Sequence, residues 1–363
     1  MSQPELTKEI AYKALQTFFD QKPFVLFATG TSCAVDIEFG MGALERHLNN
    51  KITPDILTAE QASEWNAVLG RLDNHGDFES AMDGIKDHDL LNIVLKETAL
   101  CVSNAEQKHA LNVLQGSTRW PAIEIVNQLT NKFDILHIAT PNYDLLAEYA
   151  FTHAEILYTT GFWGGVIRIL DWGQAVRQMT YAENVSTSKT RMRKVTRFKK
   201  HIRLYKVHGS LNTYVLNGQV IETDAWHNNP NDVERLIITP GMAKHEKLHK
   251  YRDILLKKYD SAVAEHTAFL FLGFGFNDNQ LVMNAINPKL VNHDCPALII
   301  TRDSNPQIER LLRRAKNTWL VCKNQHDGDD ATRIFNTEYK NWLTLPDKRL
   351  WQFDAFATEI MGG

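Results

Sequence analysis

Short, almost wholly apolar runs recur along the chain, and they constrain its fold more than any other feature. The later runs are separated by stretches rich in helix formers, near 248–266, 279–287 and 305–316. Runs that are apolar without alternation are typical of strands buried on both faces. We therefore predict an α/β fold with a Rossmann-like parallel sheet that is covered by helices on both faces. The runs are FVLFATG (24–30), FDILHIAT (133–140), IRLYKVHGS (202–210), RLIITPG (235–241), AFLFLGFGFND (268–278), PALIITRD (296–303) and TWLVCK (318–323).

The chain is long enough for one large domain with insertions, or for two domains. Its 363 residues are 44% hydrophobic and 23% charged, which is the balance of a globular protein with a full core. Residues 42–130 contain little strand-like sequence and many helix formers. We predict a sheet domain formed by 1–41 and 131–363, a helical insertion at 42–130, and a smaller second insertion with a basic segment at 160–205.

Charge and cysteine usage exclude several classes of protein. The formal net charge of −3 gives no overall electrostatic footprint for nucleic acid or a membrane, so such a partner would need a local patch. No apolar run approaches the roughly 20 residues that span a bilayer, and the N-terminus lacks the apolar segment of a signal peptide, so we expect a cytoplasmic protein with no membrane partner. We expect neither disulfides nor a metal site, because the cysteines are scattered and form no CxxC pair. They are Cys33, Cys101, Cys295 and Cys322.

One segment departs from the average composition. Residues 188–206 contain nine Lys or Arg and no acidic residue. Such a run is most often a solvated loop or a subunit contact. The functional alternative is a local site for nucleic acid, phosphate or an acidic partner, and the sequence leaves both interpretations open.

Polar and glycine residues follow four of the predicted strands, at the end of the sheet where open α/β folds bind ligands. After the first strand, Gly30 permits close backbone approach, and Thr31 and Ser32 offer hydroxyls beside a helix start that favours phosphate. A simple turn is the alternative. After the second strand come Asn142 and Asp144, which are either ligand contacts or turn and helix-capping residues.

The third and fourth strand ends carry a histidine and paired glycines. His208 is followed by Gly209 and Ser210, a setting suited to general base chemistry, although most histidines are surface or core residues. Gly273 and Gly275 leave the fourth strand as a GxG pattern, which indicates either a dinucleotide contact or glycines needed for packing.

Together these four motifs resemble the sirtuin-like family. ATGTS, TPNYD, VHGS and GFGFND occur in that order, and the match is closest to a bacterial branch found in antiphage defence, in which Asn-Tyr-Asp replaces the Asn-Ile-Asp of deacylases. IITPG at 237–241 and YTTGFWGG at 158–165 also look like elements of that branch. The resemblance covers roughly residues 21–285.

The resemblance implies an NAD-binding domain with a helical insertion, in which NAD is a substrate. It places the first motif, with Gly30, Thr31 and Ser32, against the phosphates and ribose. The nicotinamide ribose and carboxamide would contact Asn142 and Asp144, and the ribose hydroxyls or an attacking water would contact His208. The remaining cofactor-binding residues that it implies are Gly209, Ser210, Gly273, Gly275 and Asp278, with Gly273 and Asp278 on the adenosine side.

Two departures from deacylases shape the expected reaction. Residues 209–290 contain no cysteine, whereas deacylase sirtuins have a four-cysteine zinc module after the His-Gly pair. The first motif also reads Ala-Thr-Gly-Thr-Ser instead of starting Gly-Ala-Gly. Loss of the zinc module favours water as the acceptor. We therefore predict an NAD hydrolase that releases nicotinamide and ADP-ribose, with Asn142 and His208 as catalytic residues and no metal.

Such an activity is toxic when unregulated, so we expect it to be switched on by assembly or by a partner. The resemblance implies a homo-oligomer and an activator such as a HerA-like ATPase, an Argonaute-type protein or a phage component. Two alternatives remain open. The chain could be a non-catalytic subunit that senses NAD or ADP-ribose, or an NAD-dependent deacylase or ADP-ribosyltransferase.

Overall fold

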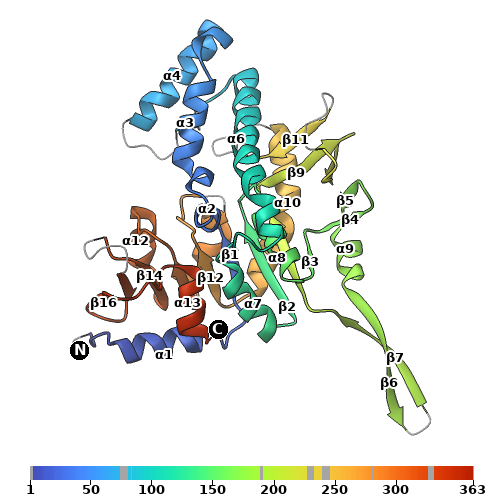
Figure 1. The fold of residues 1–363 in the computed structure, drawn as a ribbon, viewed down its shortest axis with the longest axis vertical. Coiled ribbons are helices and arrows are strands. Elements are labelled where there is room, and N and C mark those ends of the chain that lie inside the picture. The colour runs from blue at the N-terminus through green and yellow to red at the C-terminus, as the bar shows by residue number, and fades with distance from the viewer. Residues whose placement is uncertain are drawn as a thin grey trace.

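A large, mostly parallel sheet forms the centre of the protein (Figure 1). The computed structural model describes residues 3–73, 81–82, 84–188, 191–226, 233–238, 246–278, 281–325 and 331–362. Within these residues the sheet has nine strands, in the order β16-β15-β14-β13-β12-β1-β2-β8-β3. Neighbours from β14 to β3 run parallel, and β15 and β16 are antiparallel. The strands are β1 Phe24–Phe27, β2 Ile135–Thr140, β3 Tyr158–Thr159, β8 His201–Lys206, β12 Phe269–Leu272, β13 Ala297–Ile300, β14 Thr318–Lys323, β15 Thr332–Asn336 and β16 Leu343–Leu345.

The predicted fold class is confirmed, because six of the seven apolar runs form adjacent parallel strands of this sheet. The expectation for the run at 235–241 is wrong. Its strand, β11 (Glu234–Ile237), pairs antiparallel with β9 (Gly209–Leu216) in a second sheet. Glu234 and Arg235 are only half-buried, as suits a sheet with one open face. Residues 239–241 lie outside the described part of the chain.

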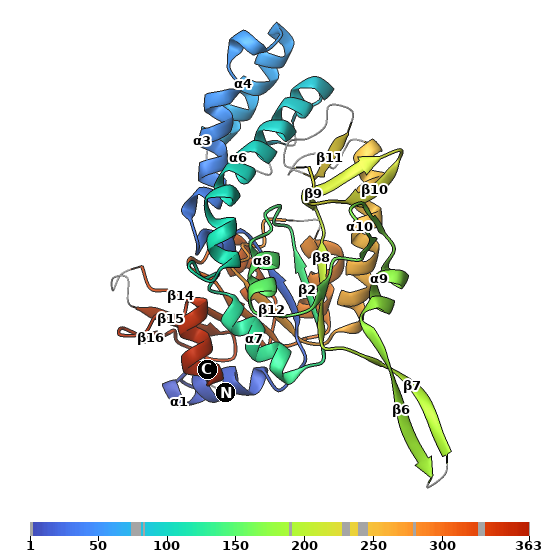
Figure 2. The same cartoon turned by 45° about the vertical axis from the view of Figure 1, so that its right-hand side comes forward.

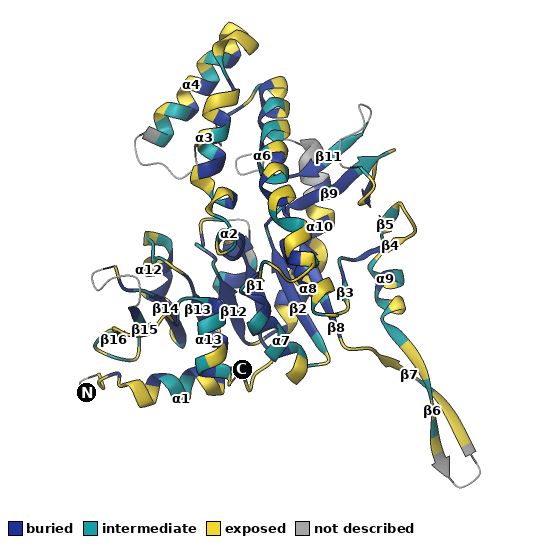
Figure 3. Ribbon diagram, in the orientation of Figure 1, coloured by how far each residue is buried: buried dark blue, intermediate teal, exposed yellow. Residues whose placement is uncertain are grey.

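Helices bury both faces of the large sheet. Successive side chains of a strand point to opposite faces, so Val25 and Phe27 of β1 belong to one apolar core, and Phe24 and Leu26 belong to the other. Figure 3 shows the central strands as almost continuously buried. The helices on the first face are α1 Lys8–Phe18, α7 Ile123–Lys132, α8 Leu146–His153 and α13 Phe353–Phe356, and those on the second are α10 Glu246–Glu265 and α12 Pro306–Leu312.

Three helices from the segment predicted to be helical project beyond the sheet (Figures 1 and 2). They are α3 Met41–Lys51, α4 Ala59–Asp73 and α6 His88–Leu114. Their side chains, including Leu48, Trp65 and Leu90, share an apolar cluster with Val220 and Leu236 of the second sheet. That sheet has the order β11-β9-β10-β5-β4 in the described residues. Its remaining strands are β4 Phe162–Gly164, β5 Arg168–Leu170 and β10 Gln219–Glu222.

A two-stranded ribbon extends away from the body of the protein (Figure 2). Its strands are β6 (Thr180–Ser188) and β7 (Arg191–Phe198), and α9 (Trp172–Gln178) precedes it. The predicted basic segment 188–206 therefore runs from the last residue of β6 through β7 to the end of β8, with residues 189–190 outside the described part. The remaining elements are short helices: α2 Thr29–Cys33, η1 Ile37–Phe39, η2 Pro54–Ile56, η4 Val282–Ile286, η5 Pro288–Asn292 and η6 Ala357–Met361.

The order of the sheet creates a crevice at the end of β1. This strand lies between β2 and β12. The chain forms β2 on one side of β1 first, and it forms β12 on the other side only later. Ligands of open α/β sheets bind at such a switch point, outside the carboxyl ends of the strands. None of the helices in the described residues is long and apolar enough to cross a membrane.

Candidate active site

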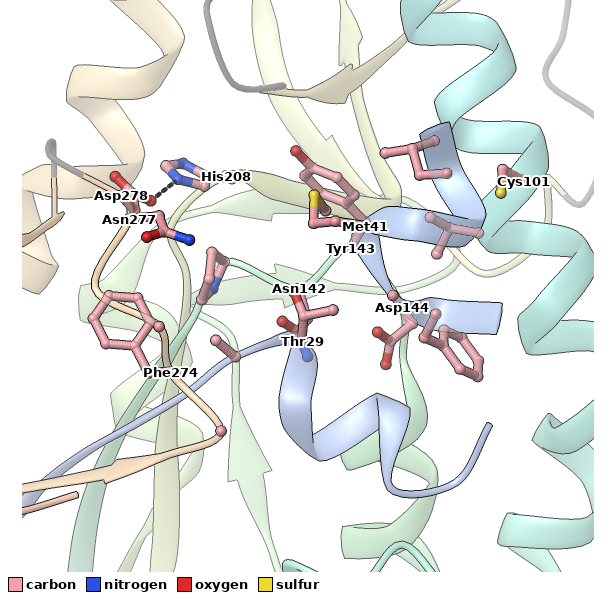
Figure 4. Close-up of a pocket in the computed structure, with 18 of the residues that line it drawn as sticks. Thr29, Met41, Cys101, Asn142, Tyr143, Asp144, His208, Phe274, Asn277 and Asp278 are labelled. Atoms are coloured by element: carbon pink, nitrogen blue, oxygen red, sulfur yellow. Dashed lines mark hydrogen bonds and ion pairs between the residues drawn. The ribbon is translucent and has the colours of Figure 1, made fainter. Parts of the chain in front are cut away.

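A cavity of about 250 Å³ lies at the carboxyl ends of β1, β2, β8 and β12 (Figure 4). Its polar side is formed by His208, Asn277 and Asp278, and its apolar side includes Met41 and Val102 from the helical segment. Six of the predicted site residues line it: Asn142, Asp144, His208, Gly273, Gly275 and Asp278. The other five, Gly30, Thr31, Ser32, Gly209 and Ser210, are not among its lining residues.

His208 is oriented by a carboxylate. Its Nε2 lies 2.6 Å from Oδ2 of Asp278, and the side chain of each is largely buried. An ionised carboxylate only accepts hydrogen bonds, so in a neutral His208 ring Nε2 carries the proton and Nδ1 carries the lone pair. Nδ1 is buried and has no hydrogen-bond partner within the described residues. A neutral imidazole in this arrangement is able to accept a proton at Nδ1.

Asn142 is held by two buried side chains. Its Nδ2 donates to Oγ of Ser32 at 3.0 Å, and this hydroxyl donates to Oδ2 of Asp144 at 2.8 Å. Oδ1 of Asp144 also accepts from the main-chain N of Leu146 at 3.2 Å, in the first turn of α8. These bonds fix the Asn142 amide. They leave its Oδ1 buried and without a hydrogen-bond partner in the part of the chain that is described.

Two of the predicted glycines bring strand ends into contact. Gly30 N donates to the carbonyl O of Gly273 at 3.1 Å, and a Cβ on Gly30 would lie 2.6 Å from Cα of Gly273. Gly273 has a φ of +59°, which favours glycine. Gly209 has a φ of +75°, and a Cβ there would lie 2.0 Å from the carbonyl O of Leu236. Backbone packing therefore requires all three glycines.

Two of the side-chain hydroxyls predicted to bind the cofactor form hydrogen bonds within the protein. Thr31 is fully buried, and its hydroxyl donates to the carbonyl O of Ala28 at 2.9 Å. Ser210 is also fully buried, and its hydroxyl donates to Oδ1 of Asn212 at 2.6 Å. Both residues shape the ends of the strands from which the cavity is built.

We expect Gly30→Ala to destabilise the protein by about 1–3 kcal/mol, because the added methyl meets backbone atoms that cannot move aside. Urea denaturation of the purified variant measures this loss. Gly70 in α4 supplies a matched control, since a Cβ there would meet nothing within 4 Å. Gly70→Ala should be neutral or stabilising by up to about 1 kcal/mol. Equal losses in the two variants would contradict the packing argument.

A buried group of charged side chains adjoins this site, and we call it the Lys206 cluster: Lys206, Asp144, Glu148 and Glu106. Lys206 Nζ lies 2.9 Å from Oε1 of Glu148 and donates to the main-chain O of Asp144 at 2.6 Å. Burial raises the pKa of Asp144 and of Glu148, and the Lys206 ammonium opposes this rise. Lys206 ends the strand that leads to His208, so it ties that strand to the loop that carries Asn142.

Glu106 joins the helical segment to the same loop. It lies on α6, and its Oε2 accepts from the main-chain N of Leu145 at 2.5 Å. Its Oε1 accepts from the Tyr149 hydroxyl at 3.3 Å. Burial, followed by the nearby charge of Asp144, raises the pKa of Glu106 to about 8. This carboxyl is therefore mostly protonated at neutral pH.

Glu106 should make stability depend on pH. Its pKa is about 8 in the folded protein and about 4.3 in an unfolded chain. Its contribution is therefore fully present below about pH 4.3 and is lost as the pH rises towards 8. The Glu106→Gln side chain has nearly the same shape but cannot ionise. The free energy of unfolding of this variant, relative to that of wild type, should therefore rise with pH, by at most about 1.4 kcal/mol per pH unit. Urea midpoints of both proteins between about pH 5 and 8 test this, and a constant difference would refute it.

The sequence analysis missed several residues of the site. Asn277 lines the cavity beside the predicted Asp278, and Tyr143 lies between the predicted Asn142 and Asp144. A signal for Lys206 was present, since a lysine two positions before His208 interrupts an apolar strand. Glu106 had no such signal. No three His, Cys, Asp or Glu side chains of the described ranges are arranged to hold a metal ion.

Comparison with known proteins agrees with the geometry. The family model described as a SIR2-like domain matches residues 136–319, just over half of the chain. The matched region begins in β2 and contains Asn142, Asp144, His208, Gly273 and Asp278. No curated protein matches the chain.

Proposed function

The chain belongs to the SIR2-like domain family, whose members use NAD, and on that premise we propose that it hydrolyses NAD to nicotinamide and ADP-ribose. One observation carries the proposal. Two buried acceptor atoms, Asn142 Oδ1 and His208 Nδ1, belong to residues that line the same cavity and have no hydrogen-bond partner in the described residues. A buried polar atom without a partner costs free energy unless a ligand or water satisfies it. A ribose hydroxyl and an attacking water are donors of the required kind.

The proposed reaction replaces one bond at the ribose C1′. Nicotinamide leaves C1′ with the electrons of the C–N bond, and the oxygen of water forms the new bond to C1′. His208 Nδ1 accepts the proton of that water as general base, while Asp278 holds the other ring nitrogen. Asn142 orients the water or a ribose hydroxyl through its free amide oxygen. Asp144 supports Asn142 through Ser32, because both of its carboxylate oxygens already accept hydrogen bonds.

The same proposal assigns the enzyme to antiphage defence, where it would deplete NAD after activation by a partner or trigger. The Asn-Tyr-Asp motif at 142–144 supports this assignment, because it is the form that resembles the defence branch. The expected activators remain a HerA-like ATPase, an Argonaute-type protein or a phage component.

The test is NAD consumption by the purified protein, alone and with lysate from phage-infected and uninfected cells. Appearance of nicotinamide and ADP-ribose in equal amounts supports the hydrolase. NAD binding without turnover in every mixture would favour a nucleotide-sensing subunit. Nicotinamide release that requires an added acyl-lysine peptide would instead indicate a deacylase, for which the apolar side of the cavity, with Met41 and Val102, offers room for an acyl group.

A further inference from the structure

The β6–β7 ribbon has no core of its own. Its strands pair only with each other in the described residues, from Thr180 opposite Phe198 to Ser188 opposite Arg191. None of the residues of 180–200 whose burial is described is buried, and Figure 3 shows the ribbon as exposed or intermediate. An isolated two-stranded hairpin is at best marginally stable in water. A ribbon of this length is therefore expected to act by binding something else.

The charge of the ribbon differs from that of the rest of the protein. Residues 180–200 contain seven of the 40 Lys and Arg and only one of the 43 Asp and Glu, so the rest of the chain has 33 basic and 42 acidic residues. The single acid, Glu183, forms an ion pair with Arg197. The ribbon is thus a positive arm on an acidic body, and this charge is complementary to a polyanion.

The strand register distributes the cations over both faces. Cross-strand pairs alternate between faces, so the Asn184–Lys194 pair lies on one face and the Val185–Arg193 pair lies on the other. The apolar side chains are divided in the same way, with Ala182, Met192 and Phe198 on the first face and Tyr181, Val185 and Val195 on the second. The stronger discriminator is charge, since the ribbon has seven cations and one acidic residue that is already paired. This excess of positive charge favours nucleic acid over a second copy of this acidic protein as the partner.

We propose that the β6–β7 ribbon is an arm that binds double-stranded DNA. The major groove of B-form DNA admits a two-stranded β-ribbon, so cations on both faces would meet the phosphates on both sides of the groove. The major groove of A-form RNA is too narrow for side chains to read, which makes duplex DNA the better fit. Ser186 and Asn184 on the first face add hydrogen-bonding groups directed at the groove. This inference goes beyond the proposed NAD hydrolysis and does not depend on it.

The experiment measures binding of a labelled duplex of about 30 base pairs by fluorescence anisotropy, between about 50 and 200 mM salt. Wild type should bind with an affinity that falls steeply with salt, because each phosphate contact contributes about 0.9 to the slope. The variant Arg193→Glu, Lys194→Glu, Lys199→Glu should lose at least about tenfold in affinity and reduce the slope by about 3. None of these three side chains lines the cavity.

A control variant reverses the charge of three exposed lysines on other elements, Lys13→Glu, Lys51→Glu and Lys108→Glu. It should bind the duplex almost as tightly as wild type. Thermal unfolding shows whether the ribbon variant is folded; if it is not, the neutral variant Arg193→Gln, Lys194→Gln, Lys199→Gln should show a smaller loss. Three results would overturn the proposal: no binding by wild type at low salt, equal binding by the ribbon variant, or tighter binding of a single strand than of the duplex. A change in oligomeric mass in the ribbon variant without a change in DNA binding would identify the partner as a second copy of the chain.

Discussion

Replacement of His208 by alanine should reduce the rate of nicotinamide release by about 10²- to 10⁴-fold, the usual contribution of a general base. The reason is that its two ring nitrogens differ in their hydrogen bonding. Nε2 is held by Asp278 at 2.6 Å, whereas Nδ1 is buried with no hydrogen-bond partner in the described residues. Alanine removes this ring, which lines the cavity and which Asp278 holds in place. Steady-state assays should show the loss mainly in kcat.

Two further variants sharpen this test. Asp278→Asn should also lower kcat, because an amide that donates to Nε2 would reverse which ring nitrogen carries the proton. His293→Ala, on an exposed residue, is the matched control and should leave the rate unchanged. If His208→Ala retained more than about a third of the wild-type kcat under conditions where wild type turns over NAD, His208 would not be the base.

Replacement of Lys206 by methionine should destabilise the fold by about 3–5 kcal/mol. Methionine has a similar length but no charge, so it leaves the buried Glu148 carboxylate and the main-chain oxygen of Asp144 without their donor. Removing one partner of a buried ion pair is costly because the other charge stays buried and uncompensated. The double variant Lys206→Met, Glu148→Gln removes that charge, and it should recover part of the loss. Urea denaturation at neutral pH measures both.

Lys316 provides the comparison for this prediction. It pairs with Asp294 at 3.1 Å on the surface, where the two side chains are 75% and 44% exposed. Exposed ion pairs contribute about 0–1 kcal/mol, so Lys316→Met should be nearly neutral. Equal effects of Lys206→Met and Lys316→Met would show that the Lys206 cluster contributes little to stability.

The parallel sheet and one edge of the candidate site could be predicted because both follow from short-range patterns. A strand buried on both faces is apolar throughout, and the residue at which it ends is visible in the sequence. Since the carboxyl ends of parallel strands meet at one edge, Asn142, His208 and Gly273 could be expected to lie together. The positions of the predicted site residues are known from the structure, and their catalytic and binding roles remain predictions.

Other features could not be predicted because they depend on which distant segments meet. Glu106 is one charged residue among many on a long helix, and only the packing of α6 against α8 places it at Leu145. The run at 235–241 has the composition of a buried strand, but its partner is β9, not the large sheet. Gly30 illustrates a third case, since its close approach to Gly273, on a strand distant in the sequence, could not be read from the turn that contains it.

The long helix α6 connects two distant parts of the protein. This single helix of 27 residues spans about 40 Å at 1.5 Å per residue. Leu90 and Leu91 near its start pack among the projecting helices, whereas Glu106 holds the loop after Asp144. The same helix therefore takes part both in the apolar cluster of α3 and α4 and in the hydrogen bonding of the loop that follows Asn142 and Asp144.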